Sequence, residues 1–222
     1  MSTDRSVPLA PQIERCALVP FEDLYAELES QEDGLLLEDR LLSGQDVSYT
    51  NFTGLELKQC VLQGCTLRGA QWKDVSLVDV VLERCDLSNA RLSGLYLHRV
   101  QFRDCKLLGT DLTGARLRNV SFRGCILRMA NFSTSKLHTV RLQDCDLSEA
   151  ALQMLAEVQY WTLQNCDLTR AELMGTRLSG CDLASCTLDG IRVTGAPELR
   201  GALVSPLQAL ALSRLLGIHI KE

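Results

Sequence analysis

Ten cysteines and three histidines are the residues of this 222-residue sequence whose types could support chemistry. Thiols can bind a metal, form disulfides or act as nucleophiles, and histidine can ligate a metal or serve as a general base. Seven cysteines recur at every twentieth position, with one longer step after Cys145: Cys65, Cys85, Cys105, Cys125, Cys145, Cys166 and Cys186. Their role therefore depends on the repeating elements that carry them.

Those elements are defined by an apolar residue at every fifth position. From Leu37 to Leu152 all 24 such positions are apolar, and after a shift of one residue the series resumes at Val158 and continues to Val193. Neither an α-helix nor a flat strand has this period. The residue two places before each apolar residue is mostly small, and positions two apart in an extended segment point the same way. Each five-residue unit therefore turns one large and one small side chain inward.

The number of units in one turn follows from the spacing of like residues. Besides the cysteines, Val80, Val100, Val120 and Val140 also recur at every twentieth position. Twelve of the fifteen glycines lie two places after a central apolar residue, which indicates a recurrent corner. We therefore expect an all-β solenoid with four units per square turn. The region 37–195 has room for about eight coils.

Three blocks carry a resemblance to a known family: Cys85–Asn89 (CDLSN), Thr110–Gly114 (TDLTG) and Cys166–Arg170 (CDLTR). They resemble the A(D/N)LXX unit of pentapeptide-repeat proteins. The resemblance implies a right-handed quadrilateral β-helix. One branch of that family consists of dimers that act on DNA gyrase, protect it from quinolones and resemble duplex DNA in width and charge.

The repeat leaves little room for catalysis. Nine of the ten cysteines, all except Cys16, occupy the small inward position, so we interpret them as core residues. His98 and His138 each follow a central residue and should point outward, so no histidine joins the cysteines in a zinc site. We also find no catalytic spacing and no phosphate-binding glycine loop. We therefore expect that the protein is not an enzyme and that it binds neither a metal nor a cofactor.

Charge is divided unevenly along the chain. The overall charge is -5, but residues 1–59 carry 12 acids and 4 bases, whereas residues 60–195 carry 14 acids and 16 bases. The coil is thus unlike the acidic rods of the DNA-mimicking members, and direct nucleic-acid binding is not expected. Stacking of every twentieth position places one basic set on a single side of the square: Tyr96, His98, Arg99, Arg116, Arg118, Lys136, His138 and Arg177. This side is either a solvated face or a docking stripe for an acidic partner.

The shift of phase adds one residue within 149–161. The segment Glu149–Tyr160 contains good helix formers and no corner glycine. Trp161 falls where the valine column holds small residues, so the square should not close normally there. The shift predicts a one-residue bulge or a short helical excursion. The resemblance to gyrase-protecting relatives, which often carry projecting loops, implies a projecting loop as a further candidate. The candidate residues are Glu149, Gln153, Met154, Glu157, Tyr160 and Trp161.

Both ends of the coil need caps. We expect an N-terminal cap segment over residues 1–36, with a helix at Pro20–Glu29. Arg40 and Gln45 in inward positions place the first regular coil near 47–50. In the C-terminal segment, 196–222, Ser205 and Pro206 predict a helix that ends near Leu216, before Gly217. Its apolar residues can cap the coil and join a homodimer: Leu207, Leu210, Leu212, Leu215 and Leu216.

These observations predict a non-enzymatic binding protein. No apolar run reaches the roughly 18 residues of a membrane helix, and the first residues are unlike a signal peptide, so we expect a cytoplasmic protein. The family resemblance favours a protein partner such as DNA gyrase, with protection from quinolone-type poisons. The alternative is a scaffold or regulatory interaction module unrelated to topoisomerases.

Overall fold

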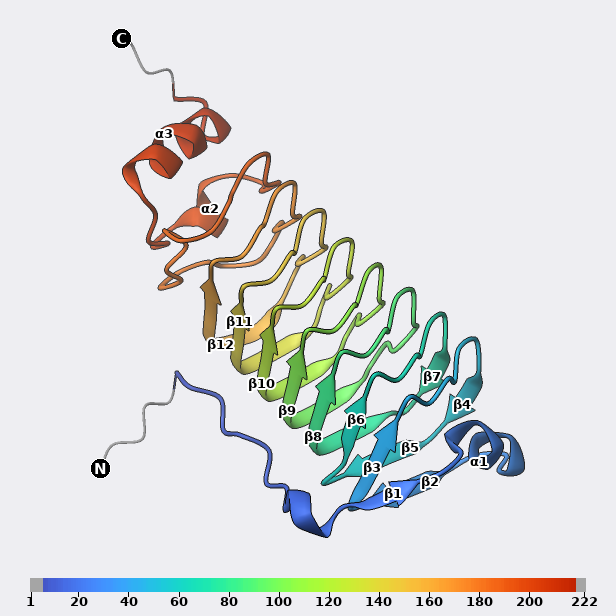
Figure 1. The fold of residues 1–222 in the computed structure, drawn as a ribbon. Coiled ribbons are helices and arrows are strands. Elements are labelled where there is room, and N and C mark those ends of the chain that lie inside the picture. The colour runs from blue at the N-terminus through green and yellow to red at the C-terminus, as the bar shows by residue number, and fades with distance from the viewer. Residues whose placement is uncertain (1–5, 219–222) are drawn as a thin grey trace.

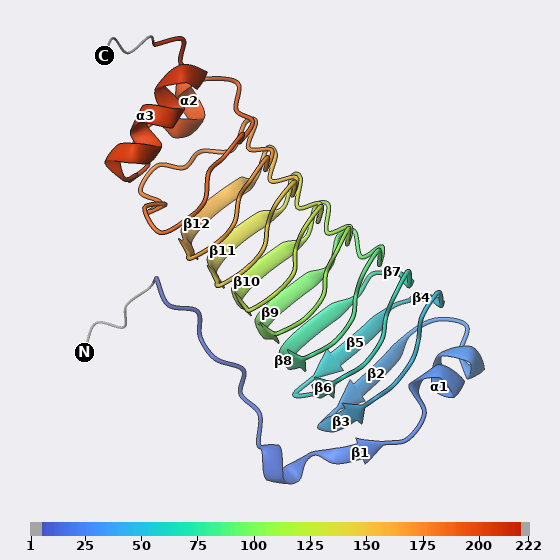
Figure 2. The same cartoon turned by 45° about the horizontal axis from the view of Figure 1, so that its top comes forward.

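The structure, a computed structural model, describes residues 6–218 and shows a rod built from the stacked turns of one coil (Figure 1). About seven turns follow one another, close to the eight expected from the length of the repeat. The segment before the coil lies alongside the rod, and two helices lie beyond its last turn (Figure 2). None of the helices in this part of the chain is long and apolar enough to cross a lipid bilayer.

The strands are short, and every strand pair is parallel. In chain order the elements are η1 (Arg15–Ala17), β1 (Val19–Phe21), α1 (Leu24–Ser30), β2 (Leu35–Glu38), β3 (Arg40–Ser43), β4 (Asn51–Thr53), β5 (Leu55–Lys58), β6 (Val61–Gln63), β7 (Gln71–Lys73), β8 (Ser76–Glu83), β9 (Tyr96–Arg103), β10 (Arg116–Arg123), β11 (Lys136–Gln143), β12 (Ala156–Gln164), α2 (Ala196–Leu199) and α3 (Pro206–Leu215). Leu97 of β9 lies beside Leu77 of β8 and Leu117 of β10, so each coil returns to the same side at every twentieth position. The predicted all-β solenoid is confirmed.

The core is formed by the two inward side chains of each five-residue unit. Leu97 and Cys105 are fully buried, and the rings of Phe102 and Phe122 stack with centroids 4.6 Å apart. Burying one leucine or phenylalanine side chain contributes about 1.5–3 kcal/mol, so the repeated column is the main source of stability. The corners between units have a positive φ, as expected from the glycines. Twenty non-glycine residues also adopt it, among them Arg99 (φ 54°) and Thr139 (φ 57°).

The N-terminal end differs from expectation in two ways. The helix α1 begins at Leu24 and not at Pro20, because Pro20 lies in β1, which pairs with β3. Parallel pairing of the coil begins at Leu35 and not near 47–50. The inward Gln45 is compatible with this early start because its side chain satisfies the backbone of the capping segment. It accepts from the Leu24 N–H (2.8 Å) and donates to the Glu22 carbonyl (3.2 Å).

The C-terminal end matches the predicted helix. Ser205 caps α3, the helix ends with Leu216 as its C-cap, and Gly217 has φ 70°. The Gln208 side chain donates to the carbonyls of Leu183 (2.8 Å) and Cys186 (2.7 Å). It thereby attaches α3 to the last turn, as the Gln45 side chain attaches the N-terminal capping segment to the first. The sequence analysis did not predict α2, whose signal is Pro197 and the capping Glu198 just after Gly195.

Candidate partner-binding surface

The predicted basic stripe lies on the first half of strands β9, β10 and β11. Two rows of outward side chains stack in register there: Tyr96, Arg116 and Lys136 in one row, and His98, Arg118 and His138 in the other. We call these six residues the basic face. Arg99 lies at the adjoining corner, where it pairs with Asp79. Arg177 follows β12 outside any strand, so no strand register relates it to these rows, and its place on the stripe stays a prediction.

The second half of the same strands adds arginines that the sequence analysis did not single out. Arg123 of β10 and Arg141 of β11 point outward beyond the corner, and Arg103 of β9 lies beside Arg123. Arg103 and Arg123 are twenty positions apart, the length of one coil, so the repeat spacing could have identified this pair from the sequence. Within residues 6–218, no ion pair is formed by Arg116, Arg118, Arg123 or Arg141. These four guanidinium groups concentrate positive charge on two neighbouring strands.

His98 contributes less charge to the basic face than its arginines do. Burial lowers the pKa of His98, and the neighbouring charges of Arg99 and Arg118 lower it further, against the opposing effect of Asp79. Its Nδ1 is buried without a hydrogen-bond partner in the described structure. A neutral ring is therefore favoured for His98, so this residue adds little to the charge of the face. Lys136 is paired with Glu157 at 2.5 Å.

The N-terminal segment crosses this surface along the corner between the two halves. We call residues 6–17 the strap. Its Leu9 N–H donates to Asn119 Oδ1 (3.3 Å) and its Gln12 N–H to Asp79 Oδ1 (2.8 Å). The sequence analysis assigned this segment only to the cap. The strap has no periodic sequence pattern. Its hydrogen bonds join residues 67 positions apart (Gln12 and Asp79) and 110 positions apart (Leu9 and Asn119), so the repeat spacing does not predict them.

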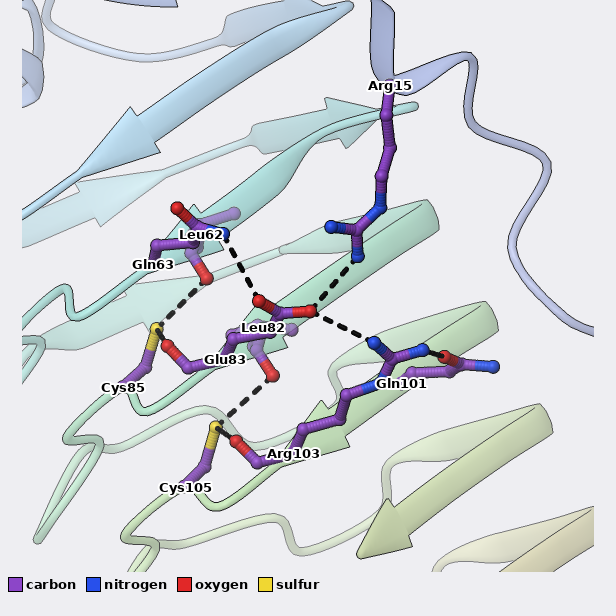
Figure 3. A network of polar contacts seen from close by, with 9 residues as sticks. All are labelled: Arg15, Leu62, Gln63, Leu82, Glu83, Cys85, Gln101, Arg103 and Cys105. Carbon is purple, nitrogen blue, oxygen red and sulfur yellow. Dashed lines mark hydrogen bonds and ion pairs between the residues drawn. The ribbon is translucent and has the colours of Figure 1, made fainter. Parts of the chain in front are cut away.

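Glu83 fastens the end of the strap to the rod. Figure 3 shows its carboxylate between three donors: Arg15 of the strap (3.0 Å), Arg103 of the next coil (3.0 Å) and Gln63 of the preceding coil (3.1 Å). Burial acts to raise the pKa of Glu83, but the hydrogen bonds from Arg15 and Gln63 and the positive charges nearby lower it overall. The carboxylate thus stays ionised and connects two coils with the strap.

Comparison with known proteins identifies the family. The family profile described as the pentapeptide repeat region matches residues 75–152 and 119–196. The chain belongs to the pentapeptide-repeat family. This finding and the stacked parallel turns agree with the resemblance carried by the CDLSN-type blocks.

Solved structures of other pentapeptide-repeat proteins are similar in fold. One is HetL from the cyanobacterium Nostoc sp. strain PCC 7120, involved in heterocyst differentiation regulation, with 20% identity over 81% of this chain and 91% of that chain, and a TM-score of 0.48. Another is full-length QnrB1, a plasmid-mediated fluoroquinolone resistance protein, with 22% identity over 85% of this chain and 93% of that chain, and a TM-score of 0.42. No curated protein matches the sequence.

The cysteine column of this pentapeptide-repeat rod is buried, and its thiols from Cys65 to Cys166 donate to backbone carbonyls inside the core. Cys85 donates to the Leu62 carbonyl (3.5 Å) and Cys105 to the Leu82 carbonyl (3.4 Å), as Figure 3 shows. Burial raises the pKa of Cys181 to about 11, so its thiol stays protonated at neutral pH. All ten cysteines are free, and in residues 6–218 no three Cys, His, Asp or Glu side chains come together to hold a metal. The column thus combines small size with a hydrogen-bond donor.

The predicted irregularity is a β-bulge. The register shifts between Lys136 and His138, where Glu157 and Val158 together lie opposite Leu137, and the expected helical excursion is absent from 149–161. Strand geometry prevails over helix propensity because the preceding turn imposes parallel pairing on the segment. The six candidate residues do not form one projecting loop. Glu149, Gln153 and Met154 belong to regular turns, whereas Glu157, Tyr160 and Trp161 belong to β12.

The C-terminal helix divides its leucines between two environments. Leu212 is only 8% exposed and packs on the coil, so it serves the capping role predicted for this helix. Leu207 is 80% exposed, and the remaining candidates, Leu210, Leu215 and Leu216, are 40–47% exposed. These four leucines leave apolar surface exposed on α3.

Proposed function

We propose that this pentapeptide-repeat protein is a non-catalytic binding rod that holds an acidic protein partner against its basic face. The proposal is supported by arginines on β10 and β11 that form no ion pair within residues 6–218. Two of them, Arg116 and Arg118 of β10, belong to the basic face. Guanidinium groups without internal partners can form charge-assisted bonds with carboxylates at little structural cost. A stacked coil holds them at a fixed spacing, which favours recognition of an extended acidic surface.

Poly-L-glutamate immobilised on a sensor surface provides a direct test. Wild-type protein should bind with an affinity that falls as salt rises, and the variant Arg116→Glu/Arg118→Glu should lose most of that binding. Lys73→Glu on β7, outside the basic face, is the matched control and should bind as wild type does. Equal binding by the basic-face variant, or preferential binding to duplex DNA, would contradict the proposal.

Protection of a type II topoisomerase is the second candidate. It rests on membership of the family and on the exposed leucines of α3, which could join two rods into the dimer typical of the gyrase-protecting branch. The basic face does not favour mimicry of DNA. A DNA gyrase supercoiling assay with and without a fluoroquinolone tests it: relief of drug inhibition or direct inhibition supports it, and no effect across a wide concentration range opposes it.

We also propose that the protein works in the cytoplasm as a homodimer. Ten free cysteines are consistent with a reducing compartment, where thiols stay unpaired. Oxidised protein bearing disulfides when isolated from its native cell would contradict this location.

A further inference from the structure

Strand β12 pairs on one side only. It pairs with β11, but within residues 6–218 no backbone hydrogen bond joins β12 to the segment that follows it in the next turn, residues 177–184. That segment bonds instead to the final partial turn, from the Leu178 N–H to the Glu198 carbonyl (2.9 Å) and from the Leu183 N–H to the Leu203 carbonyl (2.8 Å). By contrast, β9, β10 and β11 pair on both sides. A free strand edge is therefore left in the wall of the rod.

Trp161 accounts for the opening. It occupies the column that holds Val120 and Val140 in the preceding turns, and it is only 5% exposed. An indole ring needs more room than a valine, so the next turn cannot approach at the usual strand spacing of about 4.8 Å. The bulge at Glu157 also shifts the register of β12 relative to β11. The contact that remains across the opening is the Cys181 thiol, which donates to the Trp161 carbonyl at 3.7 Å.

The opening contains a hollow of about 630 Å³, which we call the slot. Glu157, Tyr160 and Trp161 of β12 line the slot, and Arg177 and Ser179 line it from the next turn. The Glu157 carboxylate is already paired with Lys136, so Arg177 is the cation left for an occupant. The volume falls within the range of about 300–1,000 Å³ that is typical of ligand sites. Tyr160 is 45% exposed and Arg177 is also exposed, so the slot is open to solvent.

Two donors in the slot have no acceptor in the described structure. Trp161 Nε1 is buried without a hydrogen-bond partner, and Arg177 forms no ion pair with any residue of 6–218. A buried N–H group without a partner is rare in proteins because it has lost its hydrogen bond to water. The slot therefore favours an occupant that supplies both a carboxylate and a second oxygen acceptor.

We propose that the slot binds an extended acidic peptide segment of a partner protein as an added strand. The peptide backbone pairs with the free edge of β12, a carboxylate meets Arg177, and an acceptor meets Trp161 Nε1. An extended chain fits better than a small carboxylate because only a chain can pair with a row of backbone N–H and C=O groups. The slot adjoins the basic face but is lined by none of its six residues, so the inference goes beyond the proposed function.

Peptide probes test this directly. The first probe is a fluorescein-labelled hexapeptide of alternating valine and glutamate, the second replaces glutamate by lysine, and the third carries alternate N-methylated amides. Fluorescence anisotropy with the full chain should show saturable binding of the first probe only. Hydrogen exchange should show new protection in residues 156–164 when that probe is bound.

Three variants locate the site. Arg177→Gln should weaken binding of the acidic peptide about tenfold, and Trp161→Phe, which keeps a ring in the column, should weaken it about threefold. Arg118→Glu on the basic face is the matched control and should leave the affinity unchanged. Circular dichroism confirms that each variant is folded.

Several results would overturn the proposal. They are the absence of saturable binding of the acidic peptide, equal binding of the N-methylated peptide, or a loss in Arg118→Glu as large as that in Arg177→Gln. Protection of residues 156–164 that depends on protein concentration and not on peptide would assign the slot to a second copy of the chain. Because poly-L-glutamate binding at the basic face is measured separately, failure here leaves that result intact.

Discussion

Arg99 of β9 and Asp79 of β8 form a two-point ion pair across one coil of the rod. Arg99 Nε donates to Asp79 Oδ1 at 2.6 Å, and a terminal guanidinium nitrogen donates to Oδ2 at 2.5 Å. The Gln12 N–H donates to the same carboxylate, so the pair also fastens the strap. Burial acts to raise the pKa of Asp79, but the hydrogen bonds from Arg99 and Gln12 lower it overall.

Removal of this carboxylate should destabilise the rod strongly. Asp79→Ala leaves the largely buried Arg99 without its partner, and we expect a loss of about 3 kcal/mol in the free energy of unfolding. Arg128→Ala breaks the exposed pair with Glu149, and should cost less than about 1 kcal/mol. Urea denaturation of the two variants provides the measurement. Similar losses in both would contradict a special role for the Asp79–Arg99 pair.

Acidification should destabilise the fold through His98. The pKa of His98 is lowered below 6.5 by burial and by the charges of Arg99 and Arg118. Because the folded protein favours the neutral ring, its contribution is fully present above about pH 6.5 and is lost as the pH falls through the lower folded pKa. Melting temperatures measured from about pH 8 to about pH 5 should fall. His98→Gln should flatten that slope, and an unchanged slope would argue against His98 as its source.

Thiol reactivity should single out Cys16. It is the one exposed cysteine of the ten, and the other nine are buried in the coil. Native protein should react quickly with an aromatic disulfide reagent at one thiol per chain, and denatured protein at all ten. Cys16→Ser should abolish the fast phase. Rapid reaction of several thiols in the native state would show that the column opens readily.

Substitutions on α3 should separate association from stability. Leu207→Lys/Leu210→Lys should yield a monomer by light scattering with an unchanged circular dichroism spectrum, because both side chains are exposed. Leu212→Ala should instead lower stability by about 2 kcal/mol, since its side chain packs on the last turn. A dimer that persists in the double variant would refute dimerisation through this helix.

Much of the rod could be predicted because its pattern is repeated. Leu97 and Leu117 share one column because every twentieth position stacks, and the same rule placed Arg116 beside Lys136 correctly. Arg177 was assigned to that face by extending the spacing past the bulge. The strand register does not reach Arg177, because in the described structure the turn that carries it forms no backbone hydrogen bond with β12.

The amino-acid sequence by itself determined the period, the inward columns, the insertion before Trp161 and the capping signal at Ser205. These are properties of local spacing, and each turn repeats the packing of the one before it. Trp161 in the valine column also predicted that the square would not close normally there. Only the tertiary structure decided that the strap crosses the corner at Asp79 and that the irregularity leaves one edge of β12 unpaired. Those two features depend on single contacts between distant segments, which leave no period in the sequence.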